Sequence, residues 1–159
     1  MKKKKIFKVV GIMTGTSMDG IDISYVSTDG IKKIKIYKEK SYQYSLNEHL
    51  NIKNIKINKR NKKKLIVKDI ILSNLIIRYI KKFILKYQIN IKEIDYISLS
   101  GQTLLHQPDK KLSIQLGNPK FISNYFKINV ISNFRANDIK HGGQGAPIGA
   151  FYHKFLINK

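Results

Sequence analysis

Apolar and polar positions near the start of the chain follow a pattern that predicts two β-strands. Residues 7–13 form a short, mainly apolar run that stops at a Thr-Gly pair. Residues 21–27 alternate, so that their apolar positions would share one face of a strand. We therefore expect two strands joined by a turn that is rich in Gly, Thr and Ser.

The next segments predict a third strand, an irregular connection and a long helix. Asp29-Gly30 is a typical hairpin pair, and apolar residues alternate over residues 31–38. Segment 41–64 is polar and rich in Lys and Asn, and it lacks a firm period, so we expect a connection with little regular structure. Over residues 65–87 the apolar side chains recur at helical spacing, which predicts a helix with one core-packing face. That face consists of Leu72, Leu75, Ile76, Tyr79, Ile80, Phe83 and Tyr87.

The second half of the chain mixes short strands with short helices. Further strands are predicted at residues 94–100, 112–116 and 128–131, and helices at 118–126 and from Pro147 onward. A proline is well suited to the first turn of that final helix. This order of elements indicates a single α/β domain over residues 1–159 with a mixed sheet.

The high positive charge of the chain is weak evidence for nucleic-acid binding. The 159 residues include 31 Lys and Arg against 10 Asp and Glu, which gives a formal net charge of +21. Almost all of the positive charge is Lys, and a coding sequence rich in A and T would enrich Lys, Ile and Asn without selection for binding. Bidentate recognition of phosphates and bases favours Arg, which occurs only as Arg60, Arg78 and Arg135. We therefore expect no sequence-specific binding of nucleic acid.

Other features exclude several kinds of site. The chain has no Cys, which excludes disulfides, thiolate metal sites and a cysteine nucleophile. No apolar run approaches the roughly 20 residues of a membrane helix. Residues 1–6 form a basic tail, and Lys8 interrupts the apolar run that follows it, unlike a signal peptide. We expect a cytoplasmic protein that has no membrane partner.

Segment 11–22, Gly-Ile-Met-Thr-Gly-Thr-Ser-Met-Asp-Gly-Ile-Asp, carries the most informative chemistry. Its glycines would let backbone amides approach a phosphate, and the hydroxyls of Thr16 and Ser17 could donate to phosphate oxygens. A carboxylate beside a phosphate is costly without a metal ion between them, so Asp19 or Asp22 would imply Mg²⁺. The pattern is neither a Walker A loop nor a dinucleotide fingerprint, and an ordinary hairpin turn is the alternative.

Further candidate groups follow predicted strand ends, where α/β sheets usually place ligand-binding residues. Arg135 suits a carboxylate or a phosphate, and a surface ion pair with Asp138 is the alternative. The glycine-rich loop at residues 142–147 could form a backbone anion nest or a hinge. A histidine in such a segment is more often structural than ligand-binding. The residues that could hydrogen-bond a polyhydroxylated ligand are Gln102, Thr103 and His106.

Together these segments resemble the anhydro-N-acetylmuramic acid kinase family over residues 7 to about 156. The motifs Gly-Thr-Ser-x-Asp-Gly and Gly-Gly-Gln-Gly-Ala-Pro in series make the resemblance specific. That family belongs to the sugar kinase, Hsc70 and actin superfamily, so the resemblance implies a mixed-sheet, ribonuclease-H-like first domain. The segments that carry it are residues 11–22, 101–108, 114–117, 133–135 and 142–147.

The resemblance also implies an activity and a set of site residues. Such kinases open the 1,6-anhydro ring of the murein sugar with water and phosphorylate its 6-hydroxyl from ATP-Mg²⁺, which yields N-acetylmuramic acid 6-phosphate in cell-wall recycling. Gln102, Thr103 and Arg135 would face the amino sugar, and Asp19 would contact Mg-ATP. The nucleotide-phosphate loop would consist of Gly15, Thr16, Ser17, Met18, Asp19, Gly20, Ile21 and Asp22.

The chain departs from the family pattern in two residues and in length. Ser100 stands where a His usually precedes Gly-Gln-Thr, and Asn133 stands where an Asp usually precedes Phe-Arg, so each position lacks a titratable group. Family members are longer, and their catalytic aspartate, adenosine site and second domain would follow beyond Lys159. We therefore expect a first domain without its own catalytic base.

Three hypotheses follow from this combination. The chain could be a kinase by descent that is active only with a separately encoded C-terminal half. It could be an inactive remnant that still folds and binds nucleotide weakly. It could instead be a basic domain that binds a polyanion, in which case its affinity should fall steeply with salt.

Overall fold

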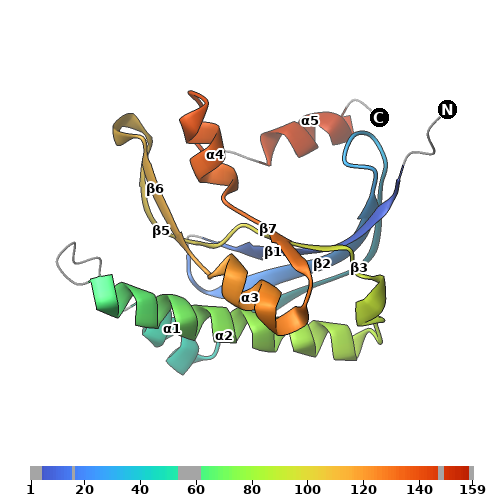
Figure 1. The fold of residues 1–159 in the computed structure, drawn as a ribbon, viewed down its shortest axis with the longest axis horizontal. Coiled ribbons are helices and arrows are strands. Elements are labelled where there is room, and N and C mark those ends of the chain that lie inside the picture. Colours follow the sequence, from blue (N-terminus) through green and yellow to red (C-terminus); the bar gives the residue numbers. More distant parts are fainter. Residues whose placement is uncertain (1–4, 16, 54–61, 147–148, 158–159) are drawn as a thin grey trace.

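The computed structural model describes residues 5–15, 17–53, 62–146 and 149–157, and it confirms a mixed α/β architecture (Figure 1). Three antiparallel strands come first, namely β1 (Phe7–Thr14), β2 (Gly20–Thr28) and β3 (Ile34–Gln43). The remaining strands and helices are α1 (Leu46–Lys53), α2 (Lys62–Lys86), β4 (Tyr96–Leu99), β5 (Gln102–Gln107), β6 (Leu112–Leu116), α3 (Pro119–Phe126), β7 (Asn129–Ile131), α4 (Phe134–Lys140) and α5 (Ala150–Ile157).

The main sheet has five strands in the order β3-β2-β1-β4-β7. β1, β2 and β3 pair antiparallel, whereas β4 pairs parallel with both β1 and β7. β5 and β6 form a separate antiparallel hairpin between β4 and α3. The sheet is therefore mixed, as the order of elements predicts.

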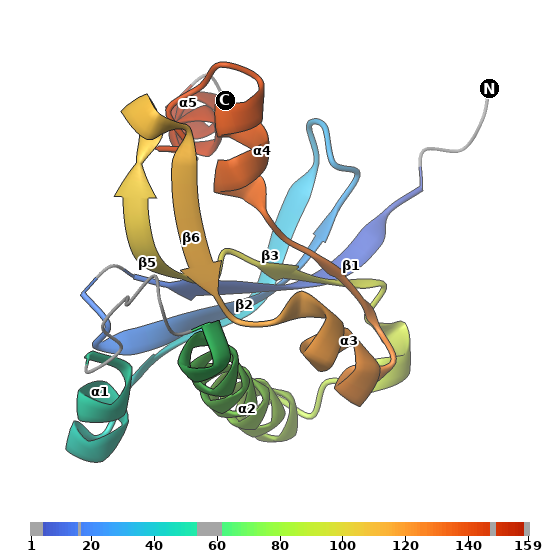
Figure 2. The same cartoon turned by 60° about the vertical axis from the view of Figure 1, so that its left-hand side comes forward.

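The core lies between the sheet and α2. Figures 1 and 2 show α1, α2 and α3 on one side of the sheet, with the β5–β6 hairpin, α4 and α5 on the other. The apolar face predicted for the long helix is confirmed, because Ile76, Ile80 and Phe83 are 0% exposed. Each such side chain contributes roughly 1.5–3 kcal/mol when it is fully buried. This packing fixes the sheet from which the candidate site extends.

The third strand begins later than its pattern predicts. A loop separates it from β2, and one carboxylate oxygen of Asp29 accepts hydrogen bonds from the amides of the three residues 31–33, each at 2.9 Å. These bonds turn the backbone of the loop away from the ladder, so the strand spans Ile34–Gln43 rather than 31–38.

The prediction of an irregular connection over residues 41–64 is wrong at both described ends. β3 continues to Gln43, α1 spans Leu46–Lys53, and α2 already begins at Lys62, while residues 54–61 lie outside the described part. α1 begins with a capping box, in which Ser45 and Glu48 exchange hydrogen bonds with each other's backbone amides. The Ser-x-x-Glu spacing in the sequence signals this helix start despite the polar composition.

Two elements in the second half were not predicted. Residues 102–107 form strand β5 instead of an open segment after β4. Two residues separate the end of β7 at Ile131 from the start of helix α4 at Phe134. The final helix is confirmed as α5, although its expected first residue, Pro147, is outside the described residues.

The edges of the main sheet are β3 and β7. β3 carries the exposed side chains of Lys35, Lys38 and Lys40, and β7 is only three residues long. Across the described ranges, no helix is both long enough and apolar enough to span a membrane.

Candidate functional site

The turn between β1 and β2 lies at the end of the sheet, beside α1 and the base of the β5–β6 hairpin (Figure 2). The carbonyl of Gly15 accepts a hydrogen bond from the Met18 amide at 3.3 Å, which closes the turn. Met18 adopts φ +59°, a left-handed conformation that costs a side-chain-bearing residue some free energy. At Gly20 a Cβ would lie 2.5 Å from the backbone carbonyl oxygen of Tyr42, so this position requires glycine.

The predicted phosphate-binding residues occupy three places rather than one. Ile21 is 1% exposed and belongs to the core. Asp22 is exposed on the other face of β2, where it lines a depression of about 810 Å³ together with Ser24 and Lys40. Thr16 is outside the described residues. The turn and the start of β2 bring together Gly15, Ser17, Met18, Asp19 and Gly20.

Asp19 presents an ionised carboxylate at the surface of this turn. The Ser17 hydroxyl donates to its Oδ1 at 2.5 Å. That hydrogen bond and a second from the residue's own backbone amide lower the pKa of Asp19 below its ordinary 3.8. Desolvation opposes them, and the neighbouring His49 adds a smaller lowering effect. The group is therefore charged at neutral pH and can bind a cation.

The donor set at the turn fits Mg²⁺ only with help from a ligand. Asp19 offers a carboxylate and Ser17 a hydroxyl, and the described residues hold no cluster of three or more His, Cys, Asp or Glu side chains that could form a metal cage. Mg²⁺ in nucleotide sites is typically held by one or two carboxylates together with phosphate oxygens and water. The turn matches that pattern better than it matches a metal site made by protein alone.

α1 and the residues before it support the turn from one side. The Tyr44 amide donates to the Asp19 carbonyl at 2.8 Å. The Nδ1 atom of His49 lies 2.8 Å from the Met18 carbonyl, and because a carbonyl only accepts, this nitrogen must carry a proton. Sequence reasoning missed both residues, because it treated their segment as an irregular connection.

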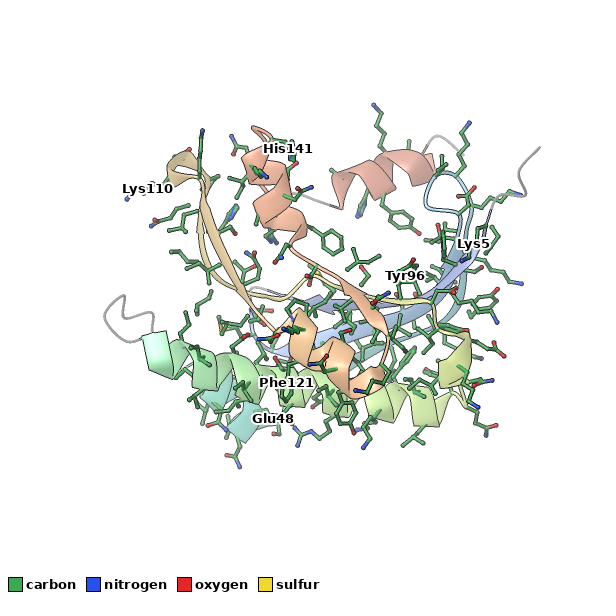
Figure 3. The ribbon with its side chains drawn as sticks, viewed as in Figure 1. Lys5, Glu48, Tyr96, Lys110, Phe121 and His141 are labelled. Atoms are coloured by element: carbon green, nitrogen blue, oxygen red, sulfur yellow. The ribbon has the colours of Figure 1, made fainter. Side chains whose placement is uncertain are left out.

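α1 is in turn tied to α2 through Glu48. Figure 3 labels Glu48 beside the helices below the sheet. Its carboxylate forms an ion pair with Arg78 and accepts a hydrogen bond from the Tyr79 hydroxyl at 3.0 Å. Desolvation of Glu48 acts to raise its pKa, but the hydrogen bonds from Ser45 and Tyr79 and the charge of Arg78 outweigh it and lower the pKa below 4.5. The turn is thus connected to the core helix through charged groups.

The corner between β4 and β5 supports the turn from the other side. Ser100 Oγ accepts a hydrogen bond from the Thr14 amide at 3.3 Å, and Gln102 Nε2 donates to the Gly15 carbonyl at 2.6 Å. Ser100, noted as a departure from the family pattern, therefore has a local hydrogen-bonding role. Gln102 is 0% exposed, so its side chain faces the interior and the turn.

The other two polar candidates of this segment lie on β5. Thr103 is half-buried and pairs with Gln115 of β6. His106 Nδ1 lies 3.1 Å from the Ser113 hydroxyl across the hairpin, which is a structural contact. Thr103 therefore stays available for a ligand to a greater extent than His106 does.

Arg135 and Asp138 hold the glycine-rich loop against α4. Arg135 Nη1 donates to the Gly145 carbonyl at 2.7 Å, and Asp138 Oδ2 accepts from the Gly145 amide at 2.7 Å. At Gly143 a Cβ would lie 2.1 Å from the same Asp138 oxygen. Asn133 precedes the helix with φ +63°, a conformation that Asn tolerates better than most residues. Both charged side chains thus hydrogen-bond to the backbone of Gly145, which gives the described part of this loop a defined conformation.

Comparison with known proteins agrees with the motifs. A family model described as anhydro-N-acetylmuramic acid kinase matches residues 7–159. A protein of that name from Pelagibacter ubique is 34% identical over 98% of this chain and 43% of its own length. Others of that name from Bradyrhizobium diazoefficiens and Agrobacterium fabrum are 30% and 32% identical over 92% of this chain, and 42% and 41% of their own lengths. The chain therefore spans less than half the length of these curated relatives.

Proposed function

The chain belongs to the anhydro-N-acetylmuramic acid kinase family, and we propose that it forms the nucleotide-phosphate turn and one wall of the sugar site of such a kinase. In this proposal it is a ribonuclease-H-like first domain of the actin and sugar-kinase type. Its ligands are ATP with Mg²⁺ and 1,6-anhydro-N-acetylmuramic acid, and it works in the cytoplasm, where ATP is supplied.

The β1–β2 turn is the observation that carries the proposal. Its carbonyls at Gly15, Met18 and Asp19 are all hydrogen-bonded to other parts of the chain. Because a trans peptide group is planar, its N–H points away from the partner that holds its carbonyl. The Asp19 amide already donates to its own carboxylate, so we propose that the turn, with its backbone held in place, binds phosphate chiefly through Mg²⁺ at the Asp19 carboxylate.

The proposed reaction couples hydrolysis to phosphoryl transfer. Water attacks the anomeric carbon of the anhydro sugar, the bond from that carbon to the 6-oxygen breaks, and the released oxygen attacks the γ-phosphoryl group of ATP. The products are N-acetylmuramic acid 6-phosphate and ADP. Bound Mg²⁺ would neutralise the phosphate charge, and Asp19 is the residue proposed to contact it. We place the base that activates water in the part of the relatives' length that this chain does not match.

Thr103 and Arg135 are the residues proposed to face the sugar. Thr103 keeps its side chain half-exposed on β5. Arg135 donates one N–H to the Gly145 carbonyl. Because a guanidinium has five N–H donors, the remaining ones can bind a lactyl carboxylate. Gln102 has a different environment from these two, because it is buried.

Nucleotide binding by the 159-residue chain tests the proposal directly. The chain is titrated with Mg²⁺ and a non-hydrolysable ATP analogue while the backbone amides are followed by NMR. We expect shifts concentrated at residues 17–20, and about tenfold weaker binding for Asp19→Asn, because a charge-assisted contact is lost. Asp109→Asn, an exposed aspartate remote from the turn, is the matched control. Binding without shifts in the turn, or equal effects of the two variants, contradicts the proposal.

The catalytic part of the proposal has its own test. We expect no phosphorylated sugar from this chain alone with ATP and Mg²⁺, because the base is proposed to lie outside the matched part, and the carboxylate of Asp138, beside Arg135, is engaged by the Gly145 amide. Turnover by the purified chain that disappears in Asp19→Asn would require a base among these 159 residues.

A further inference from the structure

Gln102 differs from every other candidate residue because its side chain is wholly buried and still reaches the turn. It is 0% exposed, and its Nε2 atom donates to the Gly15 carbonyl at 2.6 Å across 87 residues of sequence. A side chain in this position contacts the phosphate turn from the inside. The part of it that could contact a sugar is covered by protein.

The carbonyl that Gln102 holds is the one that closes the turn. The same Gly15 oxygen accepts the Met18 amide at 3.3 Å. Two donors therefore fix the position of this carbonyl, which lies at the entry to the turn. His49 and Tyr44 hold the two later carbonyls from the opposite side. Gln102 is therefore the support that comes from the hairpin.

The position of Gln102 is itself tightly constrained. It is the first residue of β5 and pairs with Leu116. The preceding Gly101 has φ +72°, and a Cβ there would lie 2.9 Å from the Gln115 Cβ and 3.0 Å from the Leu116 carbonyl oxygen. Ser100 on the other side of this glycine holds the Thr14 amide. The backbone at this corner is therefore crowded, which places the carboxamide accurately against the turn.

The chemistry of the side chain matters as much as its place. Only a donor can bind a carbonyl, so glutamate of the same shape would put a carboxylate against the Gly15 oxygen, and methionine of similar length would offer no donor. Without the Gln102 donor, the half-buried Gly15 would keep only the longer 3.3 Å hydrogen bond from the Met18 amide, so other conformations of the turn would become more favourable.

From these contacts we propose that Gln102 is a positioning residue, which fixes the Gly15 carbonyl so that the β1–β2 turn is preorganised for nucleotide phosphate. The part of this inference that concerns nucleotide rests on the proposed function. The part that concerns the shape of the turn does not, because the Gly15 contact exists without ligand. Gln102 thereby links the hairpin that carries Thr103 to the nucleotide side of the site.

The test compares Gln102→Met with Gln107→Met, the same change at the exposed far end of β5. Amide hydrogen exchange is measured without ligand, followed by the affinity for Mg²⁺ with a non-hydrolysable ATP analogue. We expect Gln102→Met to accelerate exchange at the Met18 amide about tenfold while the amides of α2 stay protected. We also expect it to weaken analogue binding by a similar factor, and Gln107→Met to change neither quantity.

Two results overturn the inference. Gln102→Met could leave exchange in the turn unchanged, or it could accelerate α2 as much as the turn, which would make Gln102 an ordinary core residue. If the wild-type chain binds no nucleotide, the proposed function fails, and the exchange measurement alone decides the role of Gln102.

A measurement on the wild-type chain avoids any dependence on whether a variant folds. The side-chain amide protons of Gln102 should exchange much more slowly than those of Gln107, and their resonances should shift when the analogue is added. Exchange of both side chains at the same fast rate would show that the Gly15 contact does not persist in solution, and the inference would be wrong.

Discussion

The two glycine-rich segments of this chain are held in opposite ways. The β1–β2 turn is held by Tyr44, His49 and Gln102, which are 25 or more positions away in the sequence. The glycine-rich loop at residues 142–147 is held at Gly145 by Arg135 and Asp138, which are ten and seven residues away on the preceding helix. The first segment therefore depends on the whole fold, whereas the second depends on one helix.

The difference has a functional meaning if the turn receives nucleotide. A turn supported by three distant elements keeps its shape only while the sheet, α1 and the hairpin keep theirs. A loop clamped by its own helix can open without disturbing the core. The following predictions test this contrast, from the largest expected effect to the smallest.

Loss of core packing should affect the turn far more than the loop. We expect Phe83→Ala to cost about 3–5 kcal/mol, because it removes a fully buried ring that packs under the sheet. Hydrogen exchange at the Met18 amide should accelerate in step with that loss, while exchange at the Gly145 amide changes little. Leu85→Ala, at a position that is 73% exposed on the same helix, is the control. Equal acceleration of exchange at both amides would show that the loop depends on the core as much as the turn does.

Adding a methyl group should cost more in the turn than in the loop. At Gly20 the new Cβ meets a backbone carbonyl, which cannot move alone, so we expect Gly20→Ala to cost about 1–3 kcal/mol. At Gly143 it meets the Asp138 side chain, which can rotate at the cost of one hydrogen bond, or about 1 kcal/mol. Urea unfolding of the two variants measures the order, and a larger loss for Gly143→Ala would reverse it.

Acid should loosen the turn through Glu48. Its pKa is lowered in the folded chain, so its stabilising effect is complete above its ordinary value of 4.5 and is lost as pH falls through the lower folded value. We expect protection of the turn amides to decrease over that window, with a loss of about 1 kcal/mol in Glu48→Gln at neutral pH. That variant should also show a flatter pH profile than Glu39→Gln, a control on the exposed edge strand. Identical pH profiles for both variants would exclude Glu48 as the link.

The smallest effect compares two histidines. His49 Nδ1 lies 2.8 Å from the Met18 carbonyl, and His141 Nδ1 lies 2.8 Å from the Asn137 carbonyl at the end of α4. Figure 3 labels His141. We expect His49→Ala to accelerate exchange only around residues 18–20, and His141→Ala only around residues 137–145. Each loss should be about 0.5–1 kcal/mol. Effects that cross between the regions would show that the two segments are coupled.

Elements with a local periodic pattern could be predicted from the sequence, whereas elements that lack one or depend on tertiary pairing could not. The strands of the first sheet and the long helix were predictable, because period and burial are local signals in those segments. α4 was not predicted, although its clamp on Gly145 is local, because the short run 134–140 shows no clear period. β5 was missed because its strand character comes from pairing with β6, and its polar residues read as a ligand segment.

In the candidate site, too, some residues were predictable from the sequence and others were not. Glycines and hydroxyls identified the turn and Asp19 as the centre of interest. The partners of the turn could not be inferred, since Tyr44, His49 and Gln102 reach it only through the tertiary fold. The exception is the Ser45–Glu48 capping box, a local pattern that predicts α1 and thereby the position of His49.

The lysines on edge strand β3 indicate a role for the positive charge of the chain that requires no ligand. An unpaired strand at a sheet edge is a template for the strand of another molecule, and charged side chains on it oppose such pairing. Lys35, Lys38 and Lys40 lie on β3, where a second copy would have to bring its own lysines against them. A composition that drifted towards lysine would thus protect this chain from β-aggregation at its most exposed edge.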